Sequence, residues 1–490
     1  MKNSGLIRAR AEDGRWCILH RRTCISAATR ALFALVIPYS VGAQHVSQLP
    51  SLTRLAGAWV GIAGTPPFSL PLVLSISTTS GGSLIASLTN AAEGANRDSR
   101  VRFVRDSVFG SLGLPAYFQF SGKLTSAADT LRLSSTAGAF TMVRAVRTQQ
   151  IRRPVPYREM ELSFATADGS RVPGTLLLPN VVTRFPIVVM TAGVGSHDRD
   201  GSTMHHYPFR VIADYLARRG IATFRYDSRG PAIFDSAGAK SRPFGYADDL
   251  VCALEKLSSI EDLAGHSFGL LGHGEGAVIS SVVSARRSDV KFLVLLSGVG
   301  VSRDSLELLQ SLQIAKANGL DTASAEELNA FLDARRAFVS RSDSSSEVAR
   351  RAFEEAIGKL GGEISDVDRA AIQRTLNSAH MFTRSRAFRE FGMVNPQIYL
   401  SQLRIPVLAL SGAKDTQVPP RENLSAIRAA LIAGGNSDFQ TTLLPNLNHI
   451  LQFAHSGEMN ESLLFEETIS PEVLEILQGW ILLRTGPQRR

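Results

Sequence analysis

The stretch Phe268-Gly269-Leu270-Leu271-Gly272-His273-Gly274-Glu275-Gly276 decides how this chain of 490 residues folds. It begins as a short apolar run of the kind that forms a buried strand, and a helical pattern starts at Gly276. The spacing is that of G-x-S-x-G, a strained strand-to-helix turn that holds a nucleophilic serine above a sheet. The central position here is Gly274. A glycine adopts such a turn at low steric cost, but it has no side chain with which to attack a carbonyl.

Strands and helices alternate from about residue 151 to residue 490, and this alternation predicts a doubly wound, mostly parallel sheet. The expected helices span 208–219 and 248–257, with one more from 276 and a last one over 471–483 that Ser470 caps. The expected strands span 161–164, 172–178, 186–191, 221–226, 267–272, 292–296, 405–410 and 440–444.

A long helical insertion interrupts this alternation after the strand at 292–296. Helical patterns cover 302–318, 324–341 and 344–359. An insertion there lies over the carboxyl ends of the strands, where open α/β sheets bind ligands. We expect a helical cap at about 301–395; the alternative is a structural excursion away from the site.

Residues 44–150 have a strand pattern without helical periodicity. Clusters of Gly, Ser, Asn and Asp separate short apolar or alternating runs at 72–76, 83–88, 101–108, 117–120, 130–133 and 140–146. They predict a small antiparallel sheet or barrel, which opens at Gly57-Ala58-Trp59-Val60-Gly61, a G-x-W-x-G that faintly resembles the lipocalins. We expect a scaffold or docking domain, with a ligand-carrying barrel as the alternative, and a linker at 152–156.

Residues 1–43 have the pattern of a signal peptide. An apolar run over 27–41 follows several arginines and ends in Val41-Gly42-Ala43, which suits cleavage after Ala43. We therefore expect an exported protein, periplasmic or extracellular; a membrane anchor or a different start of the chain is the alternative. No other stretch is long and apolar enough to span a bilayer.

Removal of this segment changes the charge and the cysteine content. The segment carries seven basic and two acidic residues, so the formal net charge falls from +9 to +4. A net charge this small gives no reason to expect nucleic-acid binding. Cys252 is then the remaining cysteine, which excludes an intrachain disulfide.

Two further candidate residues follow successive late strands. Asp415 lies in the turn Ser411-Gly412-Ala413-Lys414-Asp415 after strand 405–410, and His449 ends Pro445-Asn446-Leu447-Asn448-His449 after strand 440–444. A nucleophile elbow, an acid and a histidine occur in this order in one class of catalytic triad. The histidine takes the proton of the nucleophile, and the acid holds the imidazole in the required tautomer. We therefore predict triad positions at Gly274, which is vacant, at Asp415 and at His449.

An oxyanion hole requires two backbone N–H groups directed at developing negative charge. Glu275, directly after the centre of the elbow, is the first candidate, and Val194 in the glycine-rich loop 192–200 is the second. Gly272 and Gly276 complete the elbow. The alternative for the loop is an ordinary glycine-rich turn.

The chain contains a second G-x-S-x-G string at Gly265-His266-Ser267-Phe268-Gly269. The residues after it extend a strand instead of starting a helix, so Ser267 is the weaker candidate for a nucleophile. The remaining histidines have no metal-ligand spacing, and no phosphate or dinucleotide motif is present. The sequence implies neither a metal nor a cofactor.

Taken together, these motifs resemble secreted bacterial esterases of the α/β-hydrolase superfamily, close to the serine-aminopeptidase-like hydrolases. The resemblance covers most of 156–480 and rests on the motifs at 192–200, 225–230, 269–276, 412–419 and 444–449. It implies an α/β-hydrolase fold with a helical cap after a small β domain. It also implies a small-molecule ester or acyl ligand, with Asp415 as acid and His449 as base.

The departure from the family pattern is Gly274, where the family has serine. Loss of a nucleophilic serine from such a triad costs about 10⁶ in turnover. We therefore expect serine catalysis to be lost or strongly reduced. One alternative is a non-catalytic, ester-binding pseudoenzyme of the cell envelope, and another is hydrolysis by a water that His449 and Asp415 activate.

Overall fold

The computed structural model describes residues 8–10, 16–18, 56–63, 70–79, 84–91, 99–104, 107–112, 118–123, 130–135, 138–180, 184–193, 197–229, 244–307, 309–310 and 392–486. The chain divides into two compact units, 1–53 and 54–490. In the first unit, β1 (Arg8–Arg10) and β2 (Trp16–Ile18) form a two-stranded antiparallel sheet. Both strands lie within the predicted signal peptide, whose apolar run lies outside the described residues.

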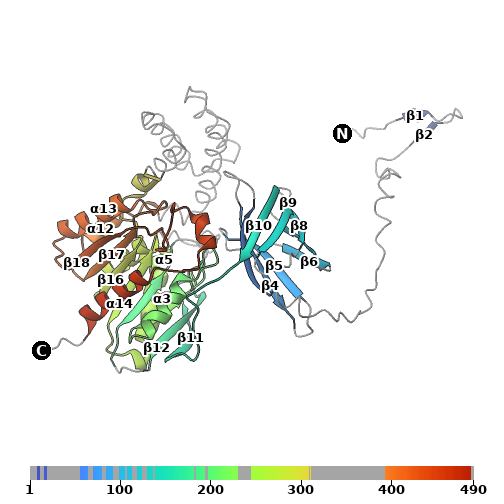
Figure 1. Ribbon diagram of the computed structural model, residues 1–490. Helices are drawn as coiled ribbons and strands as arrows, with labels where there is room; N and C mark the ends of the chain where they lie inside the picture. The colour runs from blue at the N-terminus through green and yellow to red at the C-terminus, as the bar shows by residue number, and fades with distance from the viewer. Residues whose placement is uncertain are drawn as a thin grey trace. The chain divides into compact units, whose positions relative to one another are not determined.

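The β domain is one antiparallel sheet with the strand order β5-β4-β3-β10-β9-β8-β7-β6 (Figure 1). Because β5 and β6, at the two ends of this order, also contact each other, the sheet is nearly closed. Its strands are β3 (Gly57–Ala63), β4 (Leu70–Thr78), β5 (Leu84–Asn90), β6 (Ser99–Val104), β7 (Ser107–Leu112), β8 (Phe118–Lys123), β9 (Thr130–Ser135) and β10 (Gly138–Arg144).

One expected strand of this domain was wrong. The run at 101–108 is divided between β6 and β7, which pair antiparallel with Val104 opposite Ser107. The dipeptide between them, Arg105-Asp106, contains neither glycine nor proline, which are the strongest turn signals. The run therefore looked continuous in the sequence.

Apolar side chains at alternate strand positions fill the interior of the β domain. Trp59 is 1% exposed there, and the guanidinium of Arg144 lies 4.4 Å from the centre of its ring. The core around Trp59 comprises Ala63, Leu72, Leu74, Ile76, Leu88, Val108, Phe120, Leu131, Leu133, Phe140 and Met142. The tryptophan of the G-x-W-x-G motif is thus a core residue.

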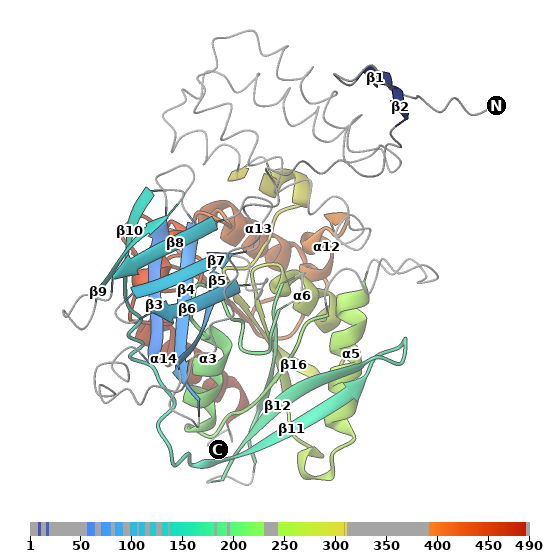
Figure 2. The same cartoon turned by 90° about the vertical axis from the view of Figure 1, so that its right-hand side faces the viewer.

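The second sheet has the strand order β11-β12-β14-β13-β15-β16-β17-β18. Figure 2 shows β11 and β12 as a long hairpin. β12 pairs antiparallel with β14, and from β14 to β18 every neighbouring pair is parallel. The strands are β11 (Tyr157–Ala165), β12 (Arg171–Pro179), β13 (Ile187–Thr191), β14 (Ala222–Tyr226), β15 (Phe268–His273), β16 (Val290–Leu296), β17 (Val407–Gly412) and β18 (Phe439–Leu444).

The strand order reverses at β13, which lies between β14 and β15. The chain leaves β13 toward one side and returns to place β15 on the other side. Such a switch point separates the loops at the carboxyl ends of the strands, and ligands bind there in open α/β sheets. The loops after β13 and β15 are those with the candidate oxyanion and elbow residues.

Helices cover both faces of this sheet (Figure 1). One face packs against α3 (Pro208–Ala217) and α14 (Pro471–Thr485). The opposite face packs against α5 (Gly245–Ser258), α6 (Gly276–Arg286), α12 (Pro396–Leu400) and α13 (Pro420–Ala433). Burial on both faces explains the continuous apolar runs of β13 and β17. The predicted doubly wound, mostly parallel sheet is confirmed.

Several helical details differ from the sequence prediction. Helices α12 and α13 were not predicted; α12, with five residues, is too short to show a helical period. Ser470 stands at the N-cap of α14, but its side chain makes no capping hydrogen bond. Two 3₁₀ helices, η2 (Glu261–Leu263) and η4 (Met459–Leu464), lie in loops.

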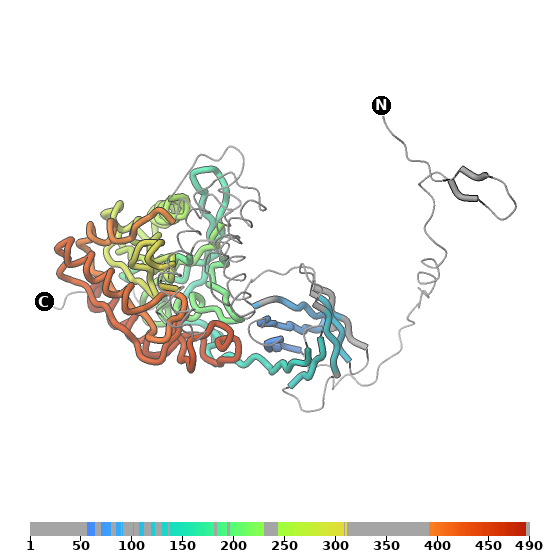
Figure 3. The backbone as a smooth tube through the Cα atoms, turned by 90° about the horizontal axis from the view of Figure 1, so that it is seen from above, coloured from blue at the N-terminus to red at the C-terminus, as the bar shows by residue number. Residues whose placement is uncertain are grey.

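The predicted cap at 301–395 lies mostly outside the described residues, which resume at Gly392. Figure 3 traces the backbone from the β domain, in blue to cyan, to the C-terminal helix α14, in red. Among the helices of the described ranges, none combines the length and the apolar character needed to span a bilayer.

Candidate active site

The elbow is the turn between β15 and α6, with Gly274 at φ +57°. Its flanking glycines allow two close backbone approaches. A Cβ at position 272 would overlap the carbonyl oxygen of Gly276, and a Cβ at position 276 would overlap that of Thr191. The turn therefore requires glycine at 272 and 276 for steric reasons, whereas the requirement at 274 is one of backbone conformation.

Asp415 and His449 meet at the carboxyl ends of β17 and β18. His449 Nδ1 and Asp415 Oδ2 lie 2.9 Å apart. The other carboxylate oxygen, Oδ1, accepts hydrogen bonds from the amides of Gln417 and Val418, both at 2.8 Å. Asp415 is 2% exposed and His449 is 9% exposed. An imidazole that donates from Nδ1 to a carboxylate presents its Nε2 atom as the acceptor.

His449 also lies beside the centre of the elbow. A Cβ built on Gly274 would lie 3.5 Å from His449 Nε2 and 3.6 Å from Cε1, which is ordinary van der Waals contact. The structure thus brings together the three residues that the sequence singled out as triad positions. The space between Gly274 and the imidazole is where a serine side chain would begin.

The main-chain carbonyl of His449 accepts two further hydrogen bonds. His273 Nε2 donates at 2.9 Å and Ser297 Oγ donates at 2.7 Å. Burial, and then the neighbouring His449, lower the pKa of His273 to about 4, so this ring is neutral at pH 7. Neither residue was expected from the sequence to have a role, although His273 directly precedes Gly274 at the centre of the elbow.

The candidate oxyanion residues are only partly described. Glu275 stands at the N-cap of α6, and a Cβ at Gly193 would lie 3.9 Å from its amide nitrogen. The loop after β13 therefore passes beside the backbone of Glu275. Val194, the second candidate donor, lies outside the described residues. The Glu275 carboxylate pairs with Arg303 at 3.4 Å.

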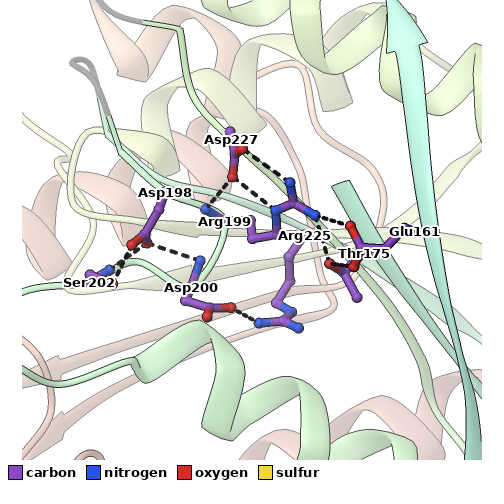
Figure 4. Close-up of polar contacts among 8 residues, drawn as sticks. All are labelled: Glu161, Thr175, Asp198, Arg199, Asp200, Ser202, Arg225 and Asp227. Carbon is purple, nitrogen blue, oxygen red and sulfur yellow. Dashed lines mark hydrogen bonds and ion pairs between the residues drawn. The ribbon is translucent and has the colours of Figure 1, made fainter. Parts of the chain in front are cut away.

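A network of charged residues anchors the loop after β13 (Figure 4). Arg225, on β14 and 4% exposed, forms an ion pair with Asp200 of this loop. Burial raises the pKa of Asp200, and Arg225 opposes that rise. Asp198 accepts hydrogen bonds from the amides of Asp200 and Ser202, which closes the turn.

Arg199 connects the same loop to two other parts of the sheet (Figure 4). Its backbone amide and its Nε atom both donate to Asp227 Oδ1 at 2.9 Å. Its Nη1 atom donates to Glu161 of β11 and to Thr175 of β12. The charged residues of the motifs at 192–200 and 225–230 thus hold the backbone that reaches Glu275.

Ser267 lies at the opposite end of β15 from the elbow. It precedes the strand, and its carbonyl accepts a hydrogen bond from the amide of Ile187, the first residue of β13. Six strand residues separate it from Gly274, which corresponds to roughly 20 Å. Asp415 and His449 follow the carboxyl ends of β17 and β18, so they lie at the opposite end of the strands from Ser267.

Metal-ligating residues do not cluster in the described part of the chain, where no group of three or more His, Cys, Asp or Glu could hold an ion.

Comparison with known proteins finds a family model and several solved structures that resemble parts of this chain. Residues 133–244 match the family model "Esterase FrsA-like". No curated protein sequence matched the chain. Similar solved structures include dienelactone hydrolase from Anabaena variabilis, which is 15% identical, with 67% of this chain and 98% of that chain covered and a TM-score of 0.37. They also include an esterase from Pyrococcus furiosus, which is 13% identical, with 70% and 98% covered and a TM-score of 0.39. The chain thus has a mostly parallel, doubly wound α/β sheet preceded by an antiparallel β domain, and its residues 133–244 are similar to the FrsA-like esterases.

Proposed function

We propose that this domain has a site of the carboxylic ester hydrolase type, from which the covalent serine step has been lost. The observation that carries the proposal is the position of His449 Nε2, 3.5 Å from a Cβ at Gly274. The base and its buried acid are in place, while the position of the nucleophile has no side chain. Small-molecule esters of carboxylic acids are the ligands that suit such a site.

In this proposal a water replaces the serine hydroxyl in the space above Gly274. The water oxygen attacks the ester carbonyl, and its proton passes to His449 Nε2. Asp415 holds the imidazole and stabilises the imidazolium that forms. The tetrahedral intermediate then collapses, and the proton on Nε2 goes to the leaving alkoxide, which gives a carboxylic acid and an alcohol.

The amide of Glu275 and the loop after β13 are the proposed stabilisers of the negative charge that develops on the carbonyl oxygen. A site that lacks its serine retains about 10³–10⁴ of rate enhancement over water from such groups and from binding. We therefore expect slow turnover without an acyl-enzyme.

A second candidate function is binding of an ester or acyl ligand without turnover. The same vacant position favours it, because an ester that binds in the site meets no covalent nucleophile at residue 274. We also propose export to the periplasm or the cell exterior, on the basis of the arginines and apolar run within residues 1–43.

Hydrolysis of p-nitrophenyl acetate and butyrate by four proteins tests the proposal: the wild type, Gly274→Ser, His449→Ala and the double variant. We expect slow turnover by the wild type and a large gain in Gly274→Ser, both abolished by His449→Ala. A fluorophosphonate should label Gly274→Ser and leave the wild type unlabelled. A silent wild type with an active Gly274→Ser favours the binding function. Labelling of the wild type, or no gain in Gly274→Ser, would contradict the vacant-nucleophile assignment.

A further inference from the structure

The segment Arg147–Gln149 joins the end of the β domain to the loops around His449. The last backbone hydrogen bond of the β sheet in this direction runs from Ala145 N to Ala58 O at 2.8 Å. Only one residue separates Ala145 from Arg147. The half-buried guanidinium of Arg147 donates hydrogen bonds of 2.8 to 3.5 Å to five main-chain carbonyl oxygens, those of Val146, Met204, His205, Leu463 and Phe465.

These contacts depend on the shape of the guanidinium as much as on its charge. Burial lowers the pKa of Arg147 to about 10, so the group stays protonated at neutral pH. A planar fork of five N–H donors reaches carbonyls on several segments at once, whereas an ammonium has three donors. Removal of this side chain leaves those carbonyls without their donor.

Gln149 makes the second attachment. Its Oε1 atom accepts hydrogen bonds from the amides of Thr468 and Ile469, at 2.8 and 3.0 Å. Its Nε2 atom donates to the carbonyl of Ile469 at 2.8 Å. Between the two side chains, the amide of Thr148 donates to the carbonyl of Glu466 at 3.0 Å. Residues 147–149 are thus attached to residues 463–469 by one main-chain hydrogen bond and by the side chains of Arg147 and Gln149.

The segment 462–470, which we term the frame, also holds the loop that bears His449. Asn448, directly before His449, donates from Nδ2 to Ser462 Oγ at 3.0 Å. Gln452 Nε2 donates to the carbonyl of Glu467 at 2.7 Å. The amide of Ser470 donates to the carbonyl of Leu451 at 2.8 Å. The frame therefore contacts the His449 loop on one side and Arg147–Gln149 on the other.

A buried histidine stiffens the frame. His206 has no exposed surface, its Nε2 atom donates to Ser462 O at 2.7 Å, and its Nδ1 atom accepts from Thr468 Oγ1 at 3.1 Å. The His449 loop itself carries two non-glycine residues at positive φ, Asn446 at +61° and Leu451 at +62°. Such backbone conformations persist only where the surroundings hold them.

We propose that Arg147 and Gln149 are positioning residues for His449. Through the frame, they hold the loop so that the imidazole stays on Asp415 and faces position 274. The assignment of His449 as the base rests on the proposed function; the positional coupling does not. In this proposal, the end of the β domain helps to determine the position of His449.

Two measurements on the full chain test this proposal. The first is the downfield proton resonance of His449 Nδ1–H, bonded to Asp415, observed by NMR in the wild-type background and assigned by its loss in His449→Gln. The second is kcat and KM for p-nitrophenyl butyrate in the Gly274→Ser background. Both are recorded for Gln149→Ala, Arg147→Lys and the conservative Gln149→Glu, which keeps the acceptor oxygens. The matched control is Arg153→Ala, because Arg153 belongs to the same connecting segment but forms an exposed ion pair with Glu159.

We expect Gln149→Ala and Arg147→Lys to broaden or abolish the resonance and to lower kcat tenfold or more, with KM within twofold. Gln149→Glu should restore part of both signals, and Arg153→Ala should change neither. If Gln149→Ala and Arg147→Lys lower the melting temperature but leave the resonance and kcat intact, their role is structural and the proposal is overturned. If Gly274→Ser is inactive while the resonance still depends on Gln149, the proposed function fails and the positioning role stands. If Gly274→Ser is inactive and the resonance is also unaffected, both are wrong.

Discussion

The Nε2 atom of His449 lies 3.5 Å from the point at which a side chain on Gly274 would begin. One residue comes from the loop after β18 and the other from the turn between β15 and α6, so only the fold brings them together. The distance is that of ordinary packing, and it leaves a serine able to fit without moving the imidazole. In the proposed function, the site therefore differs from a complete triad at one side chain.

Gly274→Ser should fold with little loss of stability. A serine Cβ meets nothing closer than 3.5 Å, and the cost of φ +57° in a residue with a Cβ is about 1–2 kcal/mol. Gly272→Ala should be much worse, because its Cβ would overlap a backbone oxygen that cannot move independently of α6. Urea denaturation of both variants compares them. Equal midpoints would mean that the elbow is not as tightly packed as the structure has it.

Asp415→Asn should remove most of the activity gained in Gly274→Ser. The amide would face His449 Nδ1 with the wrong hydrogen-bonding group and favour the wrong tautomer, which in a serine triad costs about 10⁴ in kcat. The measurement is kcat for p-nitrophenyl acetate in the double variant. Asp438→Asn is the control, because Asp438 is half exposed and pairs with Arg484 away from the site. A fall of less than tenfold in the Asp415 variant would remove Asp415 from the proposed mechanism.

Asp200→Asn should destabilise the domain by about 3–5 kcal/mol, because it leaves the buried guanidinium of Arg225 without a counter-charge. In the Gly274→Ser background it should also lower activity, since Asp200 anchors the loop that passes beside Glu275. The unfolding midpoint in urea measures the first effect. Glu159→Gln breaks an exposed ion pair and should cost less than about 1 kcal/mol. Similar losses in the two variants would contradict the buried role of Arg225.

Acid should destabilise the protein through His206. Burial lowers its pKa to about 3, below the ordinary value of about 6.5. Between these values the unfolded chain binds a proton that the folded chain does not. The contribution of neutral His206 to the free energy of unfolding is therefore complete above pH ~6.5. It is lost as the pH falls toward 3, by up to about 1.4 kcal/mol per pH unit. His273, whose pKa is lowered to about 4, should add to this loss.

Urea midpoints measured from pH 7 to pH 4.5 check this pH dependence. His206→Gln should flatten the slope, whereas a variant of the exposed His455, His455→Asn, should keep it. An unchanged slope in His206→Gln would show that His206 takes up its proton in the folded state.

The parallel sheet could be predicted because its strands are buried on both faces, and burial of that kind produces continuous apolar runs such as those of β13 and β17. Helix α13 was not recognised, and neither was the hairpin of β6 and β7, whose connecting dipeptide contains neither glycine nor proline. In each case the local sequence is compatible with two conformations. Packing against the rest of the domain selects one of them.

By itself, the sequence determined the order of the elements, the strand-to-helix turn with Gly274 at its centre, and the candidate acid and histidine, because each depends on residue types at short spacing. Only the tertiary structure decided that His273 and Ser297 hold the carbonyl of His449, that Arg225 pairs with Asp200, and that Arg147 and Gln149 reach the frame. Such contacts join segments far apart in the chain. Their geometry follows from how the sheet, its helices and its loops pack, and no local pattern encodes it.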